Sequence, residues 1–387
     1  MDKANLKIAI IGAGVGGLVT AIALREKGFN PQIFEMQEDL KEPNTAITLF
    51  PNAIRLLKQF GVLEDIYDNG EVVNHFILTN HKGKRLYHLD LNHEEIKPVS
   101  IMREYLYSIL VNKLPEGTIT FNHALREYNQ LEENVKIMFD NNKLMEADLL
   151  IGADGFKSRV RHLMKHEDAP DYHGYQIWRA IIDSPFPDIL EKGVHHFWGR
   201  GKRFGYTPLG NNKIAWWASS RESLHRINHM NSDRKKKIYN YFRNWAYPVP
   251  ELIKATEEDN ITKAGSFSKP PATTWCDGSV VLIGEAAHSV SPNLGMGISL
   301  AIEDAIILAR CLERYKSVPD ALLYYEDARI PRATAVTNNI LYAFKLSHLK
   351  KPYQLLIRDL ALKYLPKKFK EKKIREFLDY NAFAEQI

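Results

Sequence analysis

Three glycines near the start of the chain have a spacing that can bind a dinucleotide. Gly12, Gly14 and Gly17 form G-x-G-x-x-G. They directly follow the apolar run 8–11, and Glu35 comes 18 residues after Gly17. The first glycine permits a tight turn, the second lets a pyrophosphate approach the backbone, and the third lets a helix pack closely on a strand. A carboxylate placed like Glu35 accepts hydrogen bonds from a ribose diol. The pattern predicts a nucleotide site without distinguishing FAD from NAD(P); the alternative is a βαβ unit whose glycines only make turns.

The surrounding residues predict the elements that must hold these groups. The β-branched run 8–11 is typical of a parallel strand buried on both faces. Residues 18, 21, 22 and 25 follow at helical spacing, and Gly28 is placed to end that helix. Residues 31–34 then restart an extended segment that ends before Glu35. The helix therefore begins at the glycine turn and directs free N–H groups and a partial positive charge at a phosphate.

Two more acidic residues follow predicted buried strands. The segment 147–152 runs into Asp154, and the segment 278–284 runs into Glu285. Ligands bind at the carboxyl edge of open α/β sheets, so we predict a binding role for Asp154. The alternative is a turn residue that caps the next helix. After Glu285, a turn over 292–297 precedes a helix predicted over 298–312.

Between residues 174 and 219 the pattern changes to strand-like runs that are rich in aromatic residues. These runs predict antiparallel strands that form either the floor of a flat apolar pocket or a half-buried sheet, which is the commoner case. Their tryptophans are Trp178, Trp198, Trp216 and Trp217. Arg179 and Arg203 are the polar exceptions, and they can receive an anionic or carbonyl group.

Three other polar residues have less specific spacing. Arg103 opens a predicted helix, from which it can reach the nucleotide or stay in solvent, and spacing alone does not decide. His225 and His229 stand at i and i+4 in another predicted helix. Because no third ligand accompanies them, we interpret them as a solvated pair and expect no metal.

Composition sets the broad class of the protein. With 387 residues and 45% hydrophobic content, the chain is long enough for about two globular domains. Two cysteines indicate a reducing compartment rather than a disulfide framework. The sequence shows no signal-peptide pattern and no apolar run of 18 or more residues, so neither secretion nor a spanning helix is expected.

Positive charge is concentrated in the C-terminal tail. Residues 345–387 hold 11 Lys and Arg against 5 Asp and Glu, although the whole chain carries only +5. The rest of the chain is not basic, so nucleic acid is not expected as a partner. An apolar stripe within 353–364 lies beside these lysines. The tail could rest on an anionic membrane surface, but a helix that packs across two domains with solvated charges is more common.

Taken together, the motifs resemble those of the single-component FAD-dependent aromatic hydroxylases, from residue 6 to about residue 335. The likeness is to the para-hydroxybenzoate-hydroxylase-like fold, in the branch of salicylate, urate, nicotinate-type and alkylquinolone hydroxylases and zeaxanthin epoxidase. It rests on the glycine turn with Glu35, on Gly152-Ala-Asp154-Gly155 and on Gly284-Glu285, with Tyr325-x3-Arg329-x2-Arg332 as a further match.

The resemblance implies an α/β fold in which a Rossmann-like FAD-binding domain carries an inserted, mainly antiparallel β-sheet substrate domain and C-terminal helices. We expect the FAD-binding domain to comprise residues 1–75, 98–168 and 272–345. The substrate domain would comprise residues 76–97 and 169–271, and residues 346–387 would form basic amphipathic helices.

The resemblance also assigns roles position by position. Gly12, Gly14 and Gly17 would hold the FAD pyrophosphate and Glu35 the adenosine ribose. Arg103 would reach toward the pyrophosphate and ribityl region, and Asp154 would serve both FAD and NAD(P)H. Gly284-Glu285 would contact the flavin ribityl chain, and the loop with Pro292, Gly295, Met296 and Gly297 would border the isoalloxazine ring. We expect Arg203, Arg179 and Pro292 at the reaction site.

Two positions depart from the family pattern. Glu285 stands where Asp is usual, so either its contact with the ribityl chain shifts or the backbone gives way slightly. Met296 stands where Gln is usual, which makes the surroundings of the flavin more apolar. Arg203 lies where some relatives carry a catalytic His and urate-type relatives an Arg, so no phenol-deprotonating His is evident.

The expected function is that of an FAD-dependent monooxygenase. It would use NAD(P)H and O2 to hydroxylate a small aromatic or lipophilic molecule through a C4a-hydroperoxyflavin. The alternatives are the same fold performing epoxidation, antibiotic inactivation or isoprenoid reduction, and an FAD-binding protein without turnover. We expect a cytoplasmic monomer or homodimer.

Overall fold

A mostly parallel sheet of buried strands is the foundation of the molecule. The computed structural model describes residues 2–40, 44–132, 134–165, 171–186, 189, 192–223, 233–269, 272–289 and 295–387. The sheet has the order β18-β19-β12-β1-β2-β8. Its strands are β18 (Cys276–Asp277), β19 (Val280–Leu282), β12 (Leu149–Gly152), β1 (Ile8–Ile11), β2 (Gln32–Phe34) and β8 (Ile119–Thr120). All pairs are parallel except the edge pair β18–β19. Every residue of β1, β12 and β19 is buried, as a parallel sheet covered on both faces requires.

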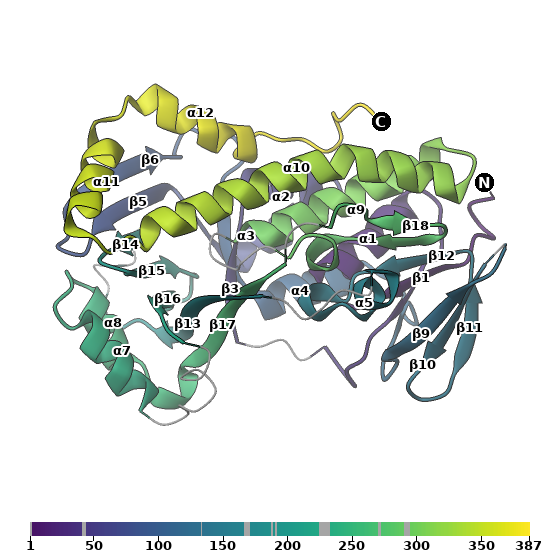
Figure 1. Ribbon diagram of the computed structural model, residues 1–387, viewed down its shortest axis with the longest axis horizontal. Coiled ribbons are helices and arrows are strands. Elements are labelled where there is room, and N and C mark those ends of the chain that lie inside the picture. Colours follow the sequence, from purple (N-terminus) through teal and green to yellow (C-terminus); the bar gives the residue numbers. More distant parts are fainter. Residues whose placement is uncertain are drawn as a thin grey trace.

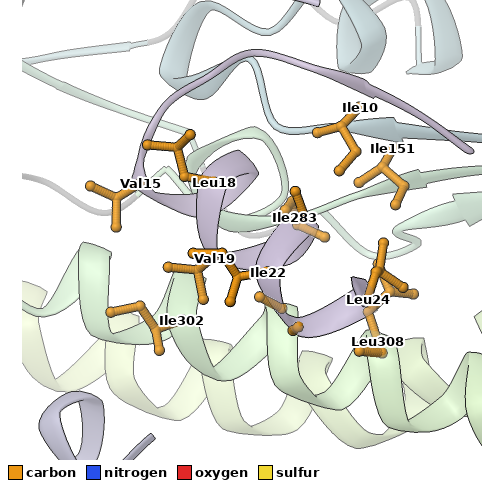
Figure 2. Close-up of a cluster of buried hydrophobic side chains, with 14 of the residues drawn as sticks. Ile10, Val15, Leu18, Val19, Ile22, Leu24, Ile151, Ile283, Ile302 and Leu308 are labelled. Atoms are coloured by element: carbon orange, nitrogen blue, oxygen red, sulfur yellow. The ribbon is translucent and has the colours of Figure 1, made fainter. Parts of the chain in front are cut away.

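Helix α1 (Val15–Glu26) lies between this sheet and α9 (Met296–Arg314). Figure 2 shows Val19 and Ile22 of α1 directed at Ile302 of α9, with Ile10 and Ile151 on the sheet side. The two helices approach closely, because a Cβ on Gly16 would lie 3.5 Å from the Ala301 Cβ. The long helix α10 (Val318–Ser347) runs beside α9 on the outside (Figure 1).

Smaller elements surround this core. A three-stranded sheet has the order β3 (Ala46–Leu49), β7 (Val99–Met102), β4 (Gly70–Val72), and a second has the order β11 (Leu144–Ala147), β10 (Val135–Phe139), β9 (Leu125–Gln130). The neighbouring helices are α2 (Pro51–Lys58), α3 (Leu63–Asp68), α4 (Arg103–Val111) and, after the short turn η1 (Gly155–Lys157), α5 (Arg159–Lys165).

A seven-stranded sheet forms the second large layer, at the left of Figure 1. Its order is β17 (Thr262–Ser268), β13 (Asp171–Asp183), β16 (Lys213–Arg221), β15 (Lys202–Pro208), β14 (Gly193–Trp198), β5 (His75–Asn80), β6 (Arg85–Asp90). All pairs are antiparallel except β14–β5. The hairpin of β5 and β6 therefore joins strands from much later in the chain.

Alternation along these strands gives the sheet two different faces. Trp178, Phe204 and Trp216 belong to a buried cluster with α7 (Arg234–Phe242) and α8 (Val249–Ala255). Their neighbours Arg179, Arg203 and Trp217 line a cavity on the other face. Both interpretations of the tryptophans thus apply, each to a different subset: Trp178 belongs to the sheet core, whereas Trp198 and Trp217 line the cavity.

The chain ends in two helices, α11 (Pro352–Tyr364) and α12 (Lys367–Leu378). α11 contacts β6, and α12 contacts α2 (Figure 1). Across the described ranges, no helix is long and apolar enough to cross a membrane. The division into domains stays a prediction; its last boundary, at residue 345, falls near the end of α10.

Candidate active site

A cavity of about 1650 Å³ extends from the glycine turn after β1 to the seven-stranded sheet and the helices α10 to α12. Pockets for drug-sized ligands usually measure about 300–1,000 Å³, so this cavity has room for a dinucleotide and a second molecule. The predicted site residues that line it are Gly12, Gly14, Glu35, Arg103, Asp154, Arg179, Arg203, Gly284, Glu285, Gly295, Met296 and Gly297. Gly17 lies behind the turn, and Pro292 falls outside the described residues, as do His225 and His229.

The three glycines of the first turn are required for different structural reasons. Gly12 has φ +103°, and a Cβ there would lie 2.6 Å from the carbonyl oxygen of Ala153. A Cβ on Gly17 would lie 2.0 Å from the carbonyl oxygen of Gly12. At Gly14, by contrast, a Cβ would meet only the hydroxyl of Tyr107, at 3.6 Å. Only glycine therefore fits at positions 12 and 17 in the described structure. At Gly14 the missing Cβ leaves space on the cavity side of the turn, where a phosphate would approach.

Glu35 is fixed at the end of β2 by the backbone around it. One carboxylate oxygen accepts a hydrogen bond from the Ala13 amide (2.8 Å) and the other from the Gln37 amide (2.9 Å). These bonds hold the carboxylate at the cavity wall beside the start of α1. Its remaining lone pairs can accept hydrogen bonds from ribose hydroxyls.

Asp154 serves the local structure and also faces the cavity. Its Oδ2 accepts hydrogen bonds from the amides of Arg159 (2.6 Å) and Val160 (3.1 Å), so the side chain caps α5. Its Oδ1 is buried and has no hydrogen-bond partner among the described residues. Burial raises the pKa of this carboxyl, although the hydrogen bonds that it accepts act to lower it. The two predicted roles are therefore compatible in one side chain.

Arg103 is connected to the start of α1 through Tyr107. The Arg103 guanidinium donates to the Tyr107 hydroxyl (3.4 Å), and that hydroxyl accepts from the Val15 amide (3.1 Å). Tyr107 lines the cavity but was not predicted. Its position one helical turn after Arg103 was the available signal.

The second strand-to-helix turn brings Glu285 to the start of α9. Gly295, with φ +71°, precedes the helix, which begins at Met296 rather than at the predicted residue 298. A Cβ on Gly297 would lie 3.7 Å from Glu285 Oε1. Burial raises the pKa of Glu285, while Arg103, His288 and Arg179 oppose that change. One carboxylate and two arginines thus share the middle of the cavity.

A buried ionic network fixes this turn, and its role was missed from the sequence. Asp304 accepts hydrogen bonds from the Gly284 amide (2.9 Å), His288 Nε2 (2.6 Å) and Arg329 Nε (2.7 Å). Arg329 also donates to Glu303 (2.9 Å), which accepts a bond from Asn52 of α2 (2.7 Å). These side chains are fully buried. The available signal was the pair Glu303-Asp304 within an apolar helix, together with Arg329 one turn after Tyr325.

The far end of the cavity combines cations, a neutral histidine and indole rings. Arg203 on β15 is 2% exposed, and burial together with Arg179 lowers its pKa to about 9. Burial also lowers the pKa of Arg179, and Arg103 adds to the effect. His196 on β14 lies edge-on to Trp217, with ring centroids 5.4 Å apart. Burial, Arg203 and His195 lower the pKa of His196 to about 3, so its ring stays neutral. His196 was not singled out from the sequence.

The residues present fit FAD. A glycine turn leaves space beside Gly14, Glu35 stands at the ribose position, Asp154 has an acceptor atom without a partner in the described structure, and the start of α9 borders the same cavity. A βαβ nucleotide cradle joined to a second strand-to-helix turn and an aromatic sheet defines a flavoprotein of the oxidoreductase class.

Comparison with known proteins gives the family. The model of the FAD binding domain family matches residues 5–340, and the chain belongs to this family. FAD is therefore its cofactor, and NAD(P)H is the reductant typical of such enzymes.

Individual relatives agree with this assignment. The chain is 28% identical over 335 residues to the aurachin C monooxygenase/isomerase of Stigmatella aurantiaca, covering 86% of this chain and 87% of that protein. It is 31% identical to the zeaxanthin epoxidase of Spinacia oleracea over 81% of this chain, and it spans about half (48%) of that longer protein. Klebsiella pneumoniae HpxO, solved with FAD and uric acid, has the same fold, with a TM-score of 0.87, 22% identity and 97% coverage of both chains.

Proposed function

We propose that this protein is an FAD-dependent monooxygenase that uses NAD(P)H and O2 to hydroxylate an aromatic or other electron-rich small molecule. The observation that carries the proposal is the continuity of the cavity, which joins the nucleotide cradle of β1–α1 to the Arg- and Trp-lined face of the seven-stranded sheet. When bound, FAD supplies the transfer of electrons from NAD(P)H to O2. The chain must then orient the substrate and exclude water.

The electrostatics of the far end favour a substrate with an electron-rich oxygen. Burial lowers the pKa of Arg203 and the nearby Arg179 lowers it further, so the two cations disfavour each other. A phenolate, enolate or carbonyl oxygen placed between them would relieve that repulsion and accept charge-assisted hydrogen bonds. His196 is neutral and can exchange a hydrogen bond with the substrate without adding charge. Trp198 and Trp217 supply flat apolar surface for a ring.

The test is a screen of NAD(P)H oxidation across phenols, N-heteroaromatic compounds and polycyclic antibiotics, with ¹⁸O2 as the oxidant. We expect a substrate that stimulates oxidation and a product that carries ¹⁸O. A product without the label would indicate a reductase. Absence of stimulation by every class of compound would favour an FAD-binding protein without turnover.

Arg203→Gln tests the role of the cavity cation. Losing one charge-assisted hydrogen bond of about 1.5–3 kcal/mol should lower substrate-stimulated kcat/KM roughly 10- to 100-fold. Binding of FAD, followed by its visible absorption, should be unchanged. Arg200→Gln is the matched control, because Arg200 is exposed on the same hairpin. Equal kcat/KM for the Arg203→Gln variant and the wild type would contradict the assignment.

Location and assembly belong to the same proposal. Both Cys276 and Cys311 are free, which supports a reducing, cytoplasmic setting. We expect a monomer or homodimer, together with peripheral rather than integral contact if the tail meets a membrane.

A further inference from the structure

Helix α11 presents a row of large apolar side chains to solvent. Tyr353, Leu356, Ile357, Leu360 and Tyr364 follow the i, i+3, i+4, i+7 spacing of one helical face, hereafter the α11 face. Between 46% and 69% of each residue is exposed. A contiguous apolar surface of this kind usually marks a contact with a membrane or another molecule.

Arg358 determines which way this face points. Its side chain is buried under the helix, where it donates to the carbonyl oxygen of Leu346 (3.2 Å) and lies over the Trp198 ring, 5.6 Å from the centroid. Asp359 accepts two further hydrogen bonds from it (2.7 and 2.9 Å). Because Arg358 secures the inner side of α11 to the body of the protein, the apolar side is held outward.

The charges around the α11 face are predominantly basic. Exposed lysines border it at both ends and on the following helix: Lys350, Lys351, Lys363, Lys368 and Lys372. The nearest carboxylate on α11, Asp359, is paired with Arg358. On α12, Arg375 is paired with Glu94 of another segment (2.8 Å). An apolar helix face bordered by lysines is complementary to a bilayer that contains anionic lipids.

The same helix forms a wall of the cavity. Leu362 and Leu365 line it, together with Leu346 of α10 and Phe377 of α12, and so does Ile357 at the edge of the α11 face. Leu356 and Leu360 do not line it and face outward. The cavity therefore reaches from the inner side of α11, beside its exposed face, to Trp198 and Arg203 at the proposed reaction site.

We propose that the α11 face rests on an anionic membrane and that a lipophilic substrate passes from the bilayer, beside α11 and α12, into the cavity. This proposal rests on the proposed monooxygenase function, whose substrate it narrows to membrane-partitioned aromatic molecules. The helix lies on the membrane surface and does not cross it.

Vesicle flotation of the FAD-loaded protein tests the contact without requiring turnover. We expect the wild type to float with phosphatidylglycerol-containing vesicles and much less with pure phosphatidylcholine. The double variant Leu356→Asp/Leu360→Asp should float at least about tenfold less, because two carboxylates would enter the apolar layer and repel anionic lipid. Leu131→Asp/Leu144→Asp is the matched control, since those leucines are similarly exposed (53% and 54%) on the β9–β11 side.

Each result bears on the proposal separately from the enzymatic function. FAD content and oxidation with a small soluble substrate should be the same in all three proteins. The proposal is overturned if the wild type does not float, or if the α11 variant floats equally well. It is also overturned if light scattering shows a dimer that only the α11 variant dissociates, because the face would then join two copies of the chain. Flotation without any substrate-stimulated oxidation would refute the monooxygenase instead.

Discussion

At the scale of single residues, glycine serves two different purposes within the turn between β1 and α1. A Cβ at position 17 would lie 2.0 Å from the Gly12 carbonyl oxygen, whereas at position 14 it would meet only Tyr107, at 3.6 Å. Gly17→Ala should therefore destabilise the protein without cofactor by about 1–3 kcal/mol through overpacking. Gly14→Ala should leave that stability within about 0.5 kcal/mol of the wild type and weaken FAD binding. Urea unfolding of the apoprotein and fluorescence titration with FAD measure the two effects, and a Gly14→Ala protein that binds FAD normally would show that no phosphate approaches there.

Glu35 offers a second test at this scale. The Glu35→Gln substitution keeps the size of the side chain but removes the charge that accepts hydrogen bonds at both carboxylate oxygens. Replacing charge-assisted hydrogen bonds should raise the Kd for FAD roughly 10- to 100-fold. Glu26→Gln, at the exposed opposite end of α1, is the control. The role of Glu35 would be rejected if both variants bound FAD equally well in equilibrium dialysis.

At the scale of elements, the buried network of Asp304 and Arg329 joins α9, α10 and the turn η4 (Gly284–Ala286). Burial opposes ionisation of Asp304, but His288 and Arg329 outweigh it and keep the pKa of the carboxyl below 3.8. Asp304→Asn would remove one of the two buried carboxylates that compensate Arg329, leaving only Glu303, and should cost about 3–5 kcal/mol of unfolding free energy. Arg332→Met, at a more exposed ion pair with Glu303, should cost less. Denaturant unfolding of both variants measures the two losses of free energy. A loss for Arg332→Met that equals or exceeds the loss for Asp304→Asn would contradict this account.

The elements also show how far the sequence can be interpreted. The β1–α1–β2 unit is local: the strand, the glycine turn, the helix and Glu35 lie within 30 residues, so their pattern can be recognised directly. The seven-stranded sheet is not local, because β5 pairs not only with β6 but also with β14, which begins at Gly193. His196 and Arg203 become neighbours only through the register of β14 with β15. Pattern within one strand cannot supply that register.

Terminal and turn positions were less predictable for a different reason. The structure divides residues 119–139 among β8, β9 and β10, and β8 needs only two residues to extend the parallel sheet beside β2. α9 begins two residues early because Gly295 adopts a positive φ that sets the helix start. The orientation of α11 depends on Arg358 reaching Leu346 and Trp198, which no periodicity within residues 353–364 indicates.

At the scale of the whole molecule, three histidines with strongly lowered pKa values predict sensitivity to acid. Burial lowers the pKa of His195 to about 4, and lowers those of His196 and His348 to about 3, from the ordinary value of 6.5. Below pH 6.5 the unfolded chain takes up protons at these positions while the folded protein does not. Stability should therefore fall as pH decreases from 6.5 toward 4, by up to about 1.4 kcal/mol per pH unit for each histidine.

A single histidine substitution isolates this effect from the carboxyl groups. Asp154 and Glu285 have raised pKa values, so their effect on stability as pH falls is opposite in sign to that of the histidines. The stability supplied by Asp304 is lost only as pH falls through its lowered pKa. His348→Gln removes one titration next to Ser219, and His93→Gln changes an exposed residue. Urea unfolding between pH 7 and 4.5, at constant FAD, should show a shallower loss of stability for His348→Gln than for the wild type or His93→Gln. Three parallel curves would mean that His348 is protonated in the folded protein, and the interior at α10 would then have to be more polar than its packing against Tyr175 and Phe344 implies.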